Sequence, residues 1–361
     1  MTQRERQLLE WIRENPMISQ QELADKAGIT RSSVAVHISN LIKKGCITGK
    51  GYIVRTDPYV AVVGGVNMDI GAVSAGALVA RDSNPGHVTT SLGGVGRNIA
   101  HNLCLLGQQT AMVTVMGDDD FGRRVQENAG DIGLDLSASA VLPDCRTGTY
   151  LYICGPDGDM ALAVNDMAIY DRMTPDFLRQ RLDFINGADL VVLETNLPEE
   201  SIRWLCDNCK APILADPVST IKAEKLRPVL GKLAALKPNR LEAELLSGMP
   251  IRTREDAAQA ARRLLDTGLG TVYISLGAEG IYAADRSGDT AWIPCARCTV
   301  ANATGGGDAV AAALAARMVL GDSLSDTARW AVGAGALACE AETTINPAMC
   351  WDNIETILNR R

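Results

Sequence analysis

The sequence has no apolar run that approaches the ~20 consecutive residues of a membrane-spanning helix. Residues 1–6 are polar and lack the apolar stretch that defines a secretory signal. A G-x-x-x-x-G-K-[ST] sequence is also missing, which excludes the P-loop class of phosphate-binding sites. These absences predict a cytoplasmic protein that has no membrane partner.

The ten cysteines are scattered along 361 residues, unlike the dense disulfide frameworks of small secreted domains. Two pairs have C-x-x-C spacing, Cys206/Cys209 and Cys295/Cys298. The first pair ends a predicted helix and the second lies in a predicted strand, and neither has the glycine turn of a zinc knuckle. Spacing alone therefore does not predict a metal or redox site here.

Charge is divided unevenly along the chain, whose formal net charge is −8 at pH 7. Residues 1–56 carry nine Lys/Arg and five Asp/Glu, whereas the remainder carries 26 and 38. This asymmetry indicates that only the basic N-terminal segment meets nucleic acid.

Residues 1–56 are predicted to form three short helices and a hairpin. The first helix has the apolar residues Leu8, Leu9, Trp11 and Ile12 on one face. The second begins at a capping box, residues 19–22, and ends at Gly28. The third opens after residues 29–33, and a hairpin over residues 45–54 turns at residues 49–51. In the third helix, Val34, Ile38, Leu41 and Ile42 are predicted to face inward.

This order resembles a winged helix-turn-helix, in which the third helix reads DNA. The residues predicted to contact bases or phosphates are Arg31, Ser32, Ser33 and His37 on that helix and Lys50 on the wing, with Lys43 and Lys44 as further phosphate contacts. The alternative is a small helical domain that serves dimerisation or packing.

Residues 57–361 are predicted to form one large α/β domain. Short apolar strands, at residues 60–63, 190–193, 213–215 and 272–275, alternate with amphipathic helices. This alternation favours a doubly wound sheet that binds ligands at the carboxyl ends of its strands. Residues 70–92 and 150–164 alternate polar and apolar side chains, which predicts a small β lid over the site.

The stretch from Asn302 to Asp308 has three successive glycines, Gly305, Gly306 and Gly307, followed by a helix of small residues. Such a turn directs several N–H groups to one point at the positive end of the helix. With a phosphoryl group on these amides, Asp308 could take a proton from a hydroxyl, which is phosphotransferase chemistry. The alternative is an aspartate that caps a helix.

Other polar residues follow predicted strands. Asn67 and Asp69 are spaced to grip two hydroxyls of a sugar, or else to form a turn. Asn239 and Glu242 suit water-mediated binding of Mg²⁺, although a helix N-cap looks the same. Residues 275–280 leave a strand into a glycine turn suited to a nucleotide, or to a simple hairpin. Residues 94–99 lack the third small residue of a dinucleotide fingerprint.

Over about residues 59–345, these segments together resemble the ribokinase-like (PfkB) carbohydrate and nucleoside kinases. Gly93-Gly94…Asn98 matches the family's sugar-binding motif, residues 305–308 match its catalytic motif, and Asn239…Glu242 matches its N-x-x-E magnesium motif. The resemblance implies ATP and Mg²⁺ as cofactors, Asp308 as the base and the amides of Gly305, Gly306 and Gly307 as the anion hole. It also implies substrate contacts from Asn67, Asp69, Gly93, Gly94, Asn98 and Glu194, and ATP contacts from Asn239, Ser275, Gly277, Gly280 and Gly307.

Within that family, residues 82–86, 93–100, 164–167, 216–219 and 236–244 look like those of pseudouridine kinases. This likeness implies phosphorylation of the 5′-hydroxyl of pseudouridine, with Asn165 and Asp166 of the lid near the base or ribose. The family usually has Asp where Asn302 stands, beside a bound potassium ion, so a requirement for K⁺ stays open. The alternatives are a kinase for another nucleoside or a pentose, and a transcriptional regulator that uses the kinase fold as a sensor. A homodimer is expected because such regulators bind paired half-sites.

Overall fold

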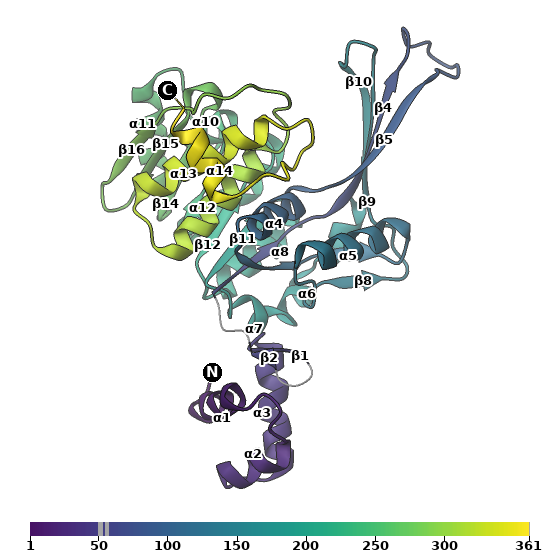
Figure 1. Cartoon of the computed structure of the whole chain (residues 1–361). Coiled ribbons are helices and arrows are strands. Elements are labelled where there is room, and N and C mark those ends of the chain that lie inside the picture. Colours follow the sequence, from purple (N-terminus) through teal and green to yellow (C-terminus); the bar gives the residue numbers. More distant parts are fainter. Residues whose placement is uncertain (50–52, 55–57, 361) are drawn as a thin grey trace.

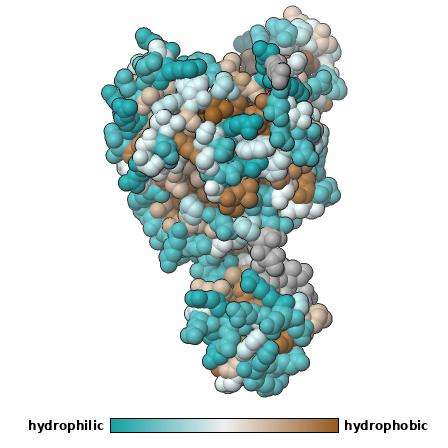
Figure 2. Space-filling model, turned by 60° about the vertical axis from the view of Figure 1, so that its left-hand side comes forward, coloured by the Kyte–Doolittle hydropathy of each residue, from teal (hydrophilic) through white to brown (hydrophobic). Residues whose placement is uncertain are grey.

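The computed structural model describes residues 1–49, 53–54 and 58–360 (Figure 1). A small N-terminal domain hangs below a large α/β body, and a sheet of long strands rises from the other end of that body (Figure 1). Figure 2 shows the N-terminal domain as a separate, mostly hydrophilic lobe.

The N-terminal domain has the three predicted helices, α1 (Gln3–Glu14), α2 (Gln20–Ala27) and α3 (Arg31–Lys43), and a strand pair, β1 (Ile47–Gly49) and β2 (Ile53–Val54). Capping boxes at Thr2 and Ser19 start α1 and α2, and Gly28 ends α2 in the left-handed conformation. The apolar faces meet in one small core that includes Leu8, Ile12 and Leu41. The prediction was wrong for Ile42, whose side chain is 51% exposed.

The body is organised around an eight-stranded sheet with the strand order β16-β15-β14-β13-β12-β11-β3-β6. The strands from β14 to β6 run parallel, and β15 and β16 add an antiparallel edge. Their bounds are β3 (Tyr59–Val63), β6 (Gln109–Val113), β11 (Leu190–Glu194), β12 (Ile213–Asp216), β13 (Ala235–Leu236), β14 (Thr271–Ser275), β15 (Ile281–Asp285) and β16 (Thr290–Ile293).

Helices cover both faces of this sheet, as predicted for a doubly wound fold. Alternate residues of β3 enter different cores: Val60 and Val62 pack on one side, Ala61 and Val63 on the other. The helices are α4 (Val95–Leu105), α5 (Asp120–Ile132), η1 (Ala168–Arg172), α6 (Pro175–Arg179), α7 (Leu182–Ile185), α8 (Glu199–Asn208), α9 (Thr220–Ala223), η2 (Glu224–Lys232), α10 (Arg240–Ser247), α11 (Arg254–Leu265), η3 (Gly277–Glu279), α12 (Gly306–Leu320), α13 (Leu324–Cys339) and α14 (Trp351–Leu358).

The predicted lid is a four-stranded sheet in the order β10-β9-β4-β5, apart from the main sheet (Figure 1). Its strands are β4 (Asn67–Ser74), β5 (Gly86–Gly93), β9 (Gly148–Cys154) and β10 (Met160–Asp166). A further parallel pair is formed by β7 (Val115–Gly117) and β8 (Ala140–Leu142), and β7 contacts α5 and η1 of the body. Because β4 begins four residues after β3 ends, the lid is joined directly to the carboxyl edge of the main sheet.

One detail differs from the sequence-based expectation, which placed the second cysteine pair in a strand. Cys295 and Cys298 follow the end of β16 and belong to no strand. Residues 275–280 join the antiparallel strands β14 and β15 through η3, so they do form a hairpin connection. Within the described part of the chain, no helix combines the length and the apolar character needed to cross a bilayer.

Candidate active site

The floor of the site is the N-terminus of α12. Gly305 is its N-cap with φ of 87°, and a Cβ there would overlap the carbonyl oxygen of Thr344. Asp308 is the third residue of the helix and makes no capping bond to it. Instead its Oδ2 accepts a hydrogen bond of 2.9 Å from Nδ2 of Asn98. The capping alternative is therefore not what the structure contains, and the carboxylate faces the site.

Asn98 reaches Asp308 because α4 begins unusually close to the strands beside it. A Cβ on Gly93 would overlap the carboxylate of Asp69, and one on Gly94, whose φ is 96°, would overlap the backbone of Gly65. The two glycines thus bring the first turn of α4 against the end of β3. Arg97 of the same turn is buried and donates to the carbonyl oxygen of Leu92, which holds the turn in place.

Asn67 and Asp69 are in strand β4 rather than in a turn, so their side chains share one face. The amide of Asn67 donates to Oδ1 of Asp69 over 2.5 Å. Burial raises the pKa of Asp69, and this hydrogen bond opposes the rise. These two adjacent polar groups have further oxygen lone pairs, which can accept hydrogen bonds from the hydroxyl groups of a polyol.

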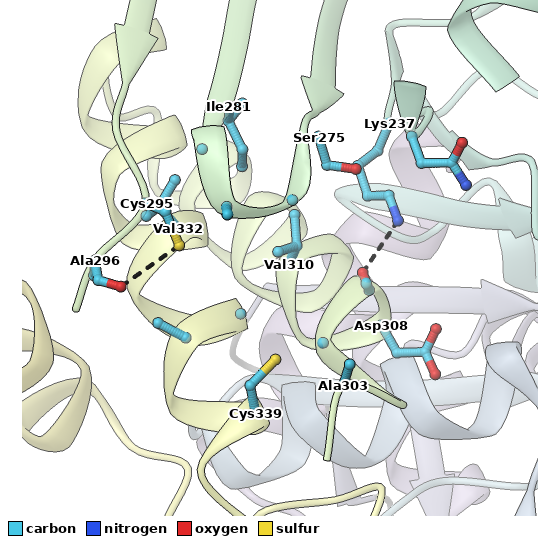
Figure 3. A pocket seen from close by; sticks show the side chains of 18 of the residues that line it. Lys237, Ser275, Ile281, Cys295, Ala296, Ala303, Asp308, Val310, Val332 and Cys339 are labelled. Atoms are coloured by element: carbon cyan, nitrogen blue, oxygen red, sulfur yellow. Dashed lines mark hydrogen bonds between the residues drawn. The ribbon is translucent and has the colours of Figure 1, made fainter. Parts of the chain in front are cut away.

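Lys237 and Asp216 form a buried ion pair, to which the sequence alone assigned no role. Nζ of Lys237 lies 2.8 Å from Oδ2 of Asp216 and donates to the carbonyl oxygen of Gly307 over 3.2 Å (Figure 3). Asp216 ends β12 and Lys237 directly follows β13. The rule that ligands bind at the carboxyl ends of parallel strands would have identified both.

The charges of these groups set their protonation. Burial raises the pKa of Asp308, the neighbouring charge of Asp216 raises it further, and Asn98 and Lys237 lower it, to a result of about 7. For Lys237, burial alone would lower the pKa, but Asp216 and Asp308 raise it above its usual range. The site thus contains a fixed cation and a carboxyl group that can change protonation state near neutral pH.

A cavity of about 740 Å³ extends from Asp308 along α12 towards β15 (Figure 3). It brings together Asp308 and Lys237 with all of the residues predicted for ATP and metal, and with Gly306 of the predicted anion hole. The ATP and metal residues are Asn239, Glu242, Ser275, Gly277, Gly280 and Gly307. Its far end is apolar, with Ile281, Val310 and Val332. The polar end beside the helix N-terminus suits the phosphates of a nucleoside triphosphate, and the apolar end suits its base.

Asn239 and Glu242 form the N-cap of α10. Oδ1 of Asn239 accepts from the N–H of Glu242 over 3.0 Å, and Oε2 of Glu242 accepts from the N–H of Asn239 over 2.8 Å. Among the described residues, no three His, Cys, Asp or Glu side chains form a ready metal cage. Oxygen donors without a cage fit Mg²⁺, which keeps waters and phosphate oxygens as ligands. The capping alternative is observed, and it leaves water-mediated metal binding as a prediction.

Asn302 has both ends of its side chain in protein hydrogen bonds. Oδ1 accepts from the N–H of Thr304 over 2.9 Å, and Nδ2 donates to the carbonyl oxygen of Glu342 over 3.0 Å. The side chain that stands where the family usually has a carboxylate is therefore a neutral amide held by the protein, and it offers K⁺ no charged ligand.

Glu194 is fully buried at the end of β11. One carboxylate oxygen accepts from the N–H of Gly65, and the other accepts from the N–H of Asn196 over 2.7 Å. Burial raises the pKa of this carboxyl. Direct substrate contact, the prediction from the resemblance, stays untested, and these bonds favour a role in holding the turn that precedes Asn67.

The strand register divides the predicted lid residues between two faces. Asn165 lies opposite Tyr150, which lies opposite Asp69, so these three share the face that carries Asn67. Asp166 is in register with Thr149 and Met68 on the other face. Tyr150 and Tyr152, whose ring centroids are 5.8 Å apart, add an aromatic surface to the Asp69 face. Neither tyrosine stands out in the sequence as a site residue.

In the N-terminal domain, Arg31 and Ser32 are exposed at the start of α3, whereas Ser33 and His37 are half-buried. Lys50 lies outside the described residues. Lys44, predicted as a phosphate contact, is paired with the buried Glu5 at 2.9 Å and so has a structural partner. The exposed N-terminus of the third helix is the part of such a domain that approaches base edges.

Two family models match the chain. The model of the pfkB family of carbohydrate kinases matches residues 57–350, and that of a winged helix-turn-helix DNA-binding domain matches residues 1–48.

Two proteins of Escherichia coli K12 are similar over most of their length. The uncharacterized sugar kinase YeiI is 35% identical over 98% of both chains. Pseudouridine kinase is 36% identical over 84% of this chain and 97% of its own. Among solved structures, a carbohydrate kinase from Agrobacterium tumefaciens matches with a TM-score of 0.74 and 27% identity, over 84% of this chain and 97% of that one. Ribokinase of Arabidopsis thaliana, complexed with ribose and ATP, matches with a TM-score of 0.76 and 23% identity, over 85% of this chain and 100% of that one, which supports the fold.

Proposed function

Because this chain belongs to the pfkB family of carbohydrate kinases, with a winged helix-turn-helix domain at its N-terminus, we propose that it transfers the γ-phosphate of ATP to the 5′-hydroxyl of pseudouridine. The observation that carries the reaction type is Asp308, which is oriented by Asn98 at the N-terminus of α12. The products are ADP and pseudouridine 5′-phosphate.

In this proposal Asp308 is the general base. Its carboxylate accepts the proton of the substrate hydroxyl as the oxygen attacks phosphorus. A pKa of about 7 makes it a stronger base than an ordinary aspartate while leaving much of it ionised at neutral pH. Asn98 fixes one carboxylate oxygen, so that the other can point to the hydroxyl.

Two groups of this chain would hold the charge of the transferring phosphoryl group. The first-turn N–H groups of α12 have no acceptor four residues back and point to the pocket. The N–H of Gly306 donates a long hydrogen bond of 3.4 Å to the carbonyl oxygen of Ala303. The N–H groups of Gly307 and Asp308 are therefore the better donors to a phosphoryl group. Lys237 supplies a fixed positive charge beside them. A bound Mg²⁺ would neutralise phosphate oxygens, with Glu242 and Asn239 near it.

The identity of the nucleoside rests on the similar pseudouridine kinase and on the lid. The Asp69 face of the lid offers an amide from Asn165 and the rings of Tyr150 and Tyr152. An amide can pair with the polar edge of a base, and aromatic rings can stack on its plane. Asn67 and Asp69 would hold ribose hydroxyls closer to Asp308.

The test is product identification by mass after incubation with ATP and an equimolar panel of pseudouridine, uridine, other nucleosides and pentoses. We expect pseudouridine monophosphate as the main product. Preferential phosphorylation of another nucleoside or a free pentose would contradict the substrate. If no ADP formed with any member of the panel, a sensor of ligands would be favoured over an enzyme. Binding of pseudouridine without turnover would establish that alternative.

We also propose that the N-terminal domain binds DNA, supported by its family match and by the exposed Arg31 and Ser32 on α3. The full chain should bind duplex DNA with an affinity that falls steeply as salt concentration rises. Arg31→Ala should weaken binding, whereas Arg254→Ala, on a helix of the kinase body, should not. Equal affinity of the wild type and Arg31→Ala at all salt concentrations would contradict this role.

A homodimer is our third proposal, and the face of the lid opposite Asp69 supports it. Cross-strand neighbours on this face are all apolar in one row, Leu162–Ile153–Ala72–Val88, and nearly so in the next, Val164–Leu151–Ile70–Thr90. Leu162, Val164 and Val88 are 57–62% exposed. A second copy of the same face would bury them, and two copies would present two recognition helices to paired half-sites.

A further inference from the structure

Three thiols line the proposed nucleotide cavity, although they are far apart in the sequence. Cys295 and Cys298 come from the segment between β16 and α12, and Cys339 is the last residue of α13. Figure 3 shows Cys295 and Cys339 beside the pocket from different elements. Sequence spacing paired Cys295 only with Cys298, and the fold adds the third thiol.

The three sulfurs differ in access. Cys295 is exposed, whereas Cys298 and Cys339 are half-buried. Sγ of Cys339 packs where a Cβ on Gly306 would meet it at 3.1 Å, so it touches the first turn of α12. Sγ of Cys295 has a weak contact of 3.5 Å with the carbonyl oxygen of Ala296 and otherwise faces the cavity. Cys295 is therefore the thiol that a reagent in the cavity meets first.

The cysteines are near enough to influence one another. Burial raises the pKa of Cys298 and of Cys339, and the charge of Cys295 raises both further. Burial also raises the pKa of Cys295. Exchange should therefore be slow at neutral pH and should accelerate about tenfold per pH unit below the thiol pKa, since the thiolate is the nucleophile.

We propose that Cys295 is a modification site at which thiol–disulfide exchange excludes the nucleotide. The thiolate of Cys295 attacks one sulfur of a small-molecule disulfide RSSR, the S–S bond of RSSR breaks, and RS⁻ leaves and takes up a proton. Cys295 then carries an S–SR group in the cavity that the proposed function gives to ATP. A reducing thiol reverses the exchange by the same steps.

The experiment incubates the full chain with oxidised glutathione at a pH of about 8.5, where the thiolate fraction is larger than at neutral pH, and locates adducts by intact and peptide mass. We expect one glutathione on Cys295, loss of ADP binding measured by calorimetry, and recovery with dithiothreitol. Pre-incubation with ADP at about ten times its Kd should slow modification about tenfold, because only about one-tenth of the sites are then free.

Two cysteine variants complete the test. The ADP affinity of Cys295→Ser is measured first, and this variant should keep the same affinity after oxidised glutathione. The control is Cys145→Ser, because Cys145 lines a separate cavity with Leu142 and Arg172. This variant should still lose ADP binding after treatment with oxidised glutathione. Modification elsewhere, or a Cys295 adduct that leaves ADP affinity unchanged, would overturn the inference. Because the inference rests on nucleotide binding, ADP affinity of the unmodified protein is measured first, and its absence would instead refute the proposed function.

Discussion

The floor of the pocket and the lid are built in opposite ways. On the floor, Asp308, Lys237 and Asp216 are held by hydrogen bonds or ion pairs, and Lys237 and Asp216 are only 4–5% exposed. The lid is a sheet of four strands that stands away from the body, with β5 and β10 largely exposed (Figure 1). In the function proposed above, the floor fixes the reaction, whereas the lid presents one face to substrate and the other to a second copy of the chain.

The largest effect should come from the base on the floor. Asp308→Asn keeps the size of the side chain but cannot take the proton, so kcat should fall about 10²- to 10⁴-fold. ADP binding should change little, because the variant keeps the cavity. Steady-state kinetics and calorimetry check the two expectations. Turnover close to the wild-type rate in this variant would remove Asp308 from the role of base.

Next in size is the buried cation. Lys237→Met should lower kcat about 10²- to 10³-fold, the loss typical when one preorganised charge donor to a transition state is removed. The variant also leaves Asp216 buried without its partner, which can unfold the protein. The double variant Lys237→Met/Asp216→Asn removes both charges, so it leaves no unpaired buried charge and should stay folded. Near-normal kcat in that double variant, with a native melting curve, would limit Lys237 to a structural role.

The sequence predicted more of the floor than of the lid, and the reason is physical. The glycines at 305 and at 93–94 are demanded by local backbone geometry and close approach, and such demands are visible in a single stretch of residues. Strand positions in β3, β11, β12 and β14 followed from apolar runs that need burial on both faces.

Contacts between distant segments could not be predicted in the same way. The pairing of Lys237 with Asp216 depends on the order of β12 and β13 in the sheet. Which of Asn165 and Asp166 shares the face of Asp69 depends on the register of β10 against β9, and one residue of slip would exchange them. Glu194 matched a family position, but only the fold shows that backbone amides occupy both of its oxygens.

A pH profile sharpens the description of the floor. A base must be deprotonated, so kcat/KM should fall as pH drops below about 7, the pKa of Asp308. The hydrogen bond from Asn98 lowers that pKa, and Asn98→Ala should therefore move the midpoint to higher pH. Asn128→Ala, which loses a bond to Arg97 nearby, is the control and should leave the midpoint in place. An unchanged midpoint in Asn98→Ala would show that titration of Asp308 does not set the pH profile.

The lid residues should affect substrate binding more than chemistry. Asn165→Ala should raise KM for the nucleoside about 2- to 12-fold, the range given by one net hydrogen bond of about 0.5–1.5 kcal/mol, with kcat nearly unchanged. Asp166→Ala lies on the opposite face and should have less effect on KM. Initial rates over a range of nucleoside concentrations check both variants. A larger rise in KM for Asp166→Ala would reverse our assignment of the two faces.

The smallest effect on catalysis should come from the outer face of the lid, although its effect on assembly should be large. Val88 and Thr89 are neighbours on β5 and point to opposite faces, and Val88 lies in the apolar row with Leu162. A charge at Val88 would have to be desolvated between two copies of that face, so Val88→Asp should shift a dimer to monomers. Thr89→Asp adds the same charge to the same strand on the other face and should leave the dimer intact.

Sedimentation velocity of both variants measures the assembly, and kcat of the monomer shows whether the floor works alone. A wild-type chain that sediments as a monomer would exclude this interface, and dissociation by Thr89→Asp rather than Val88→Asp would place the contact on the substrate side of the lid.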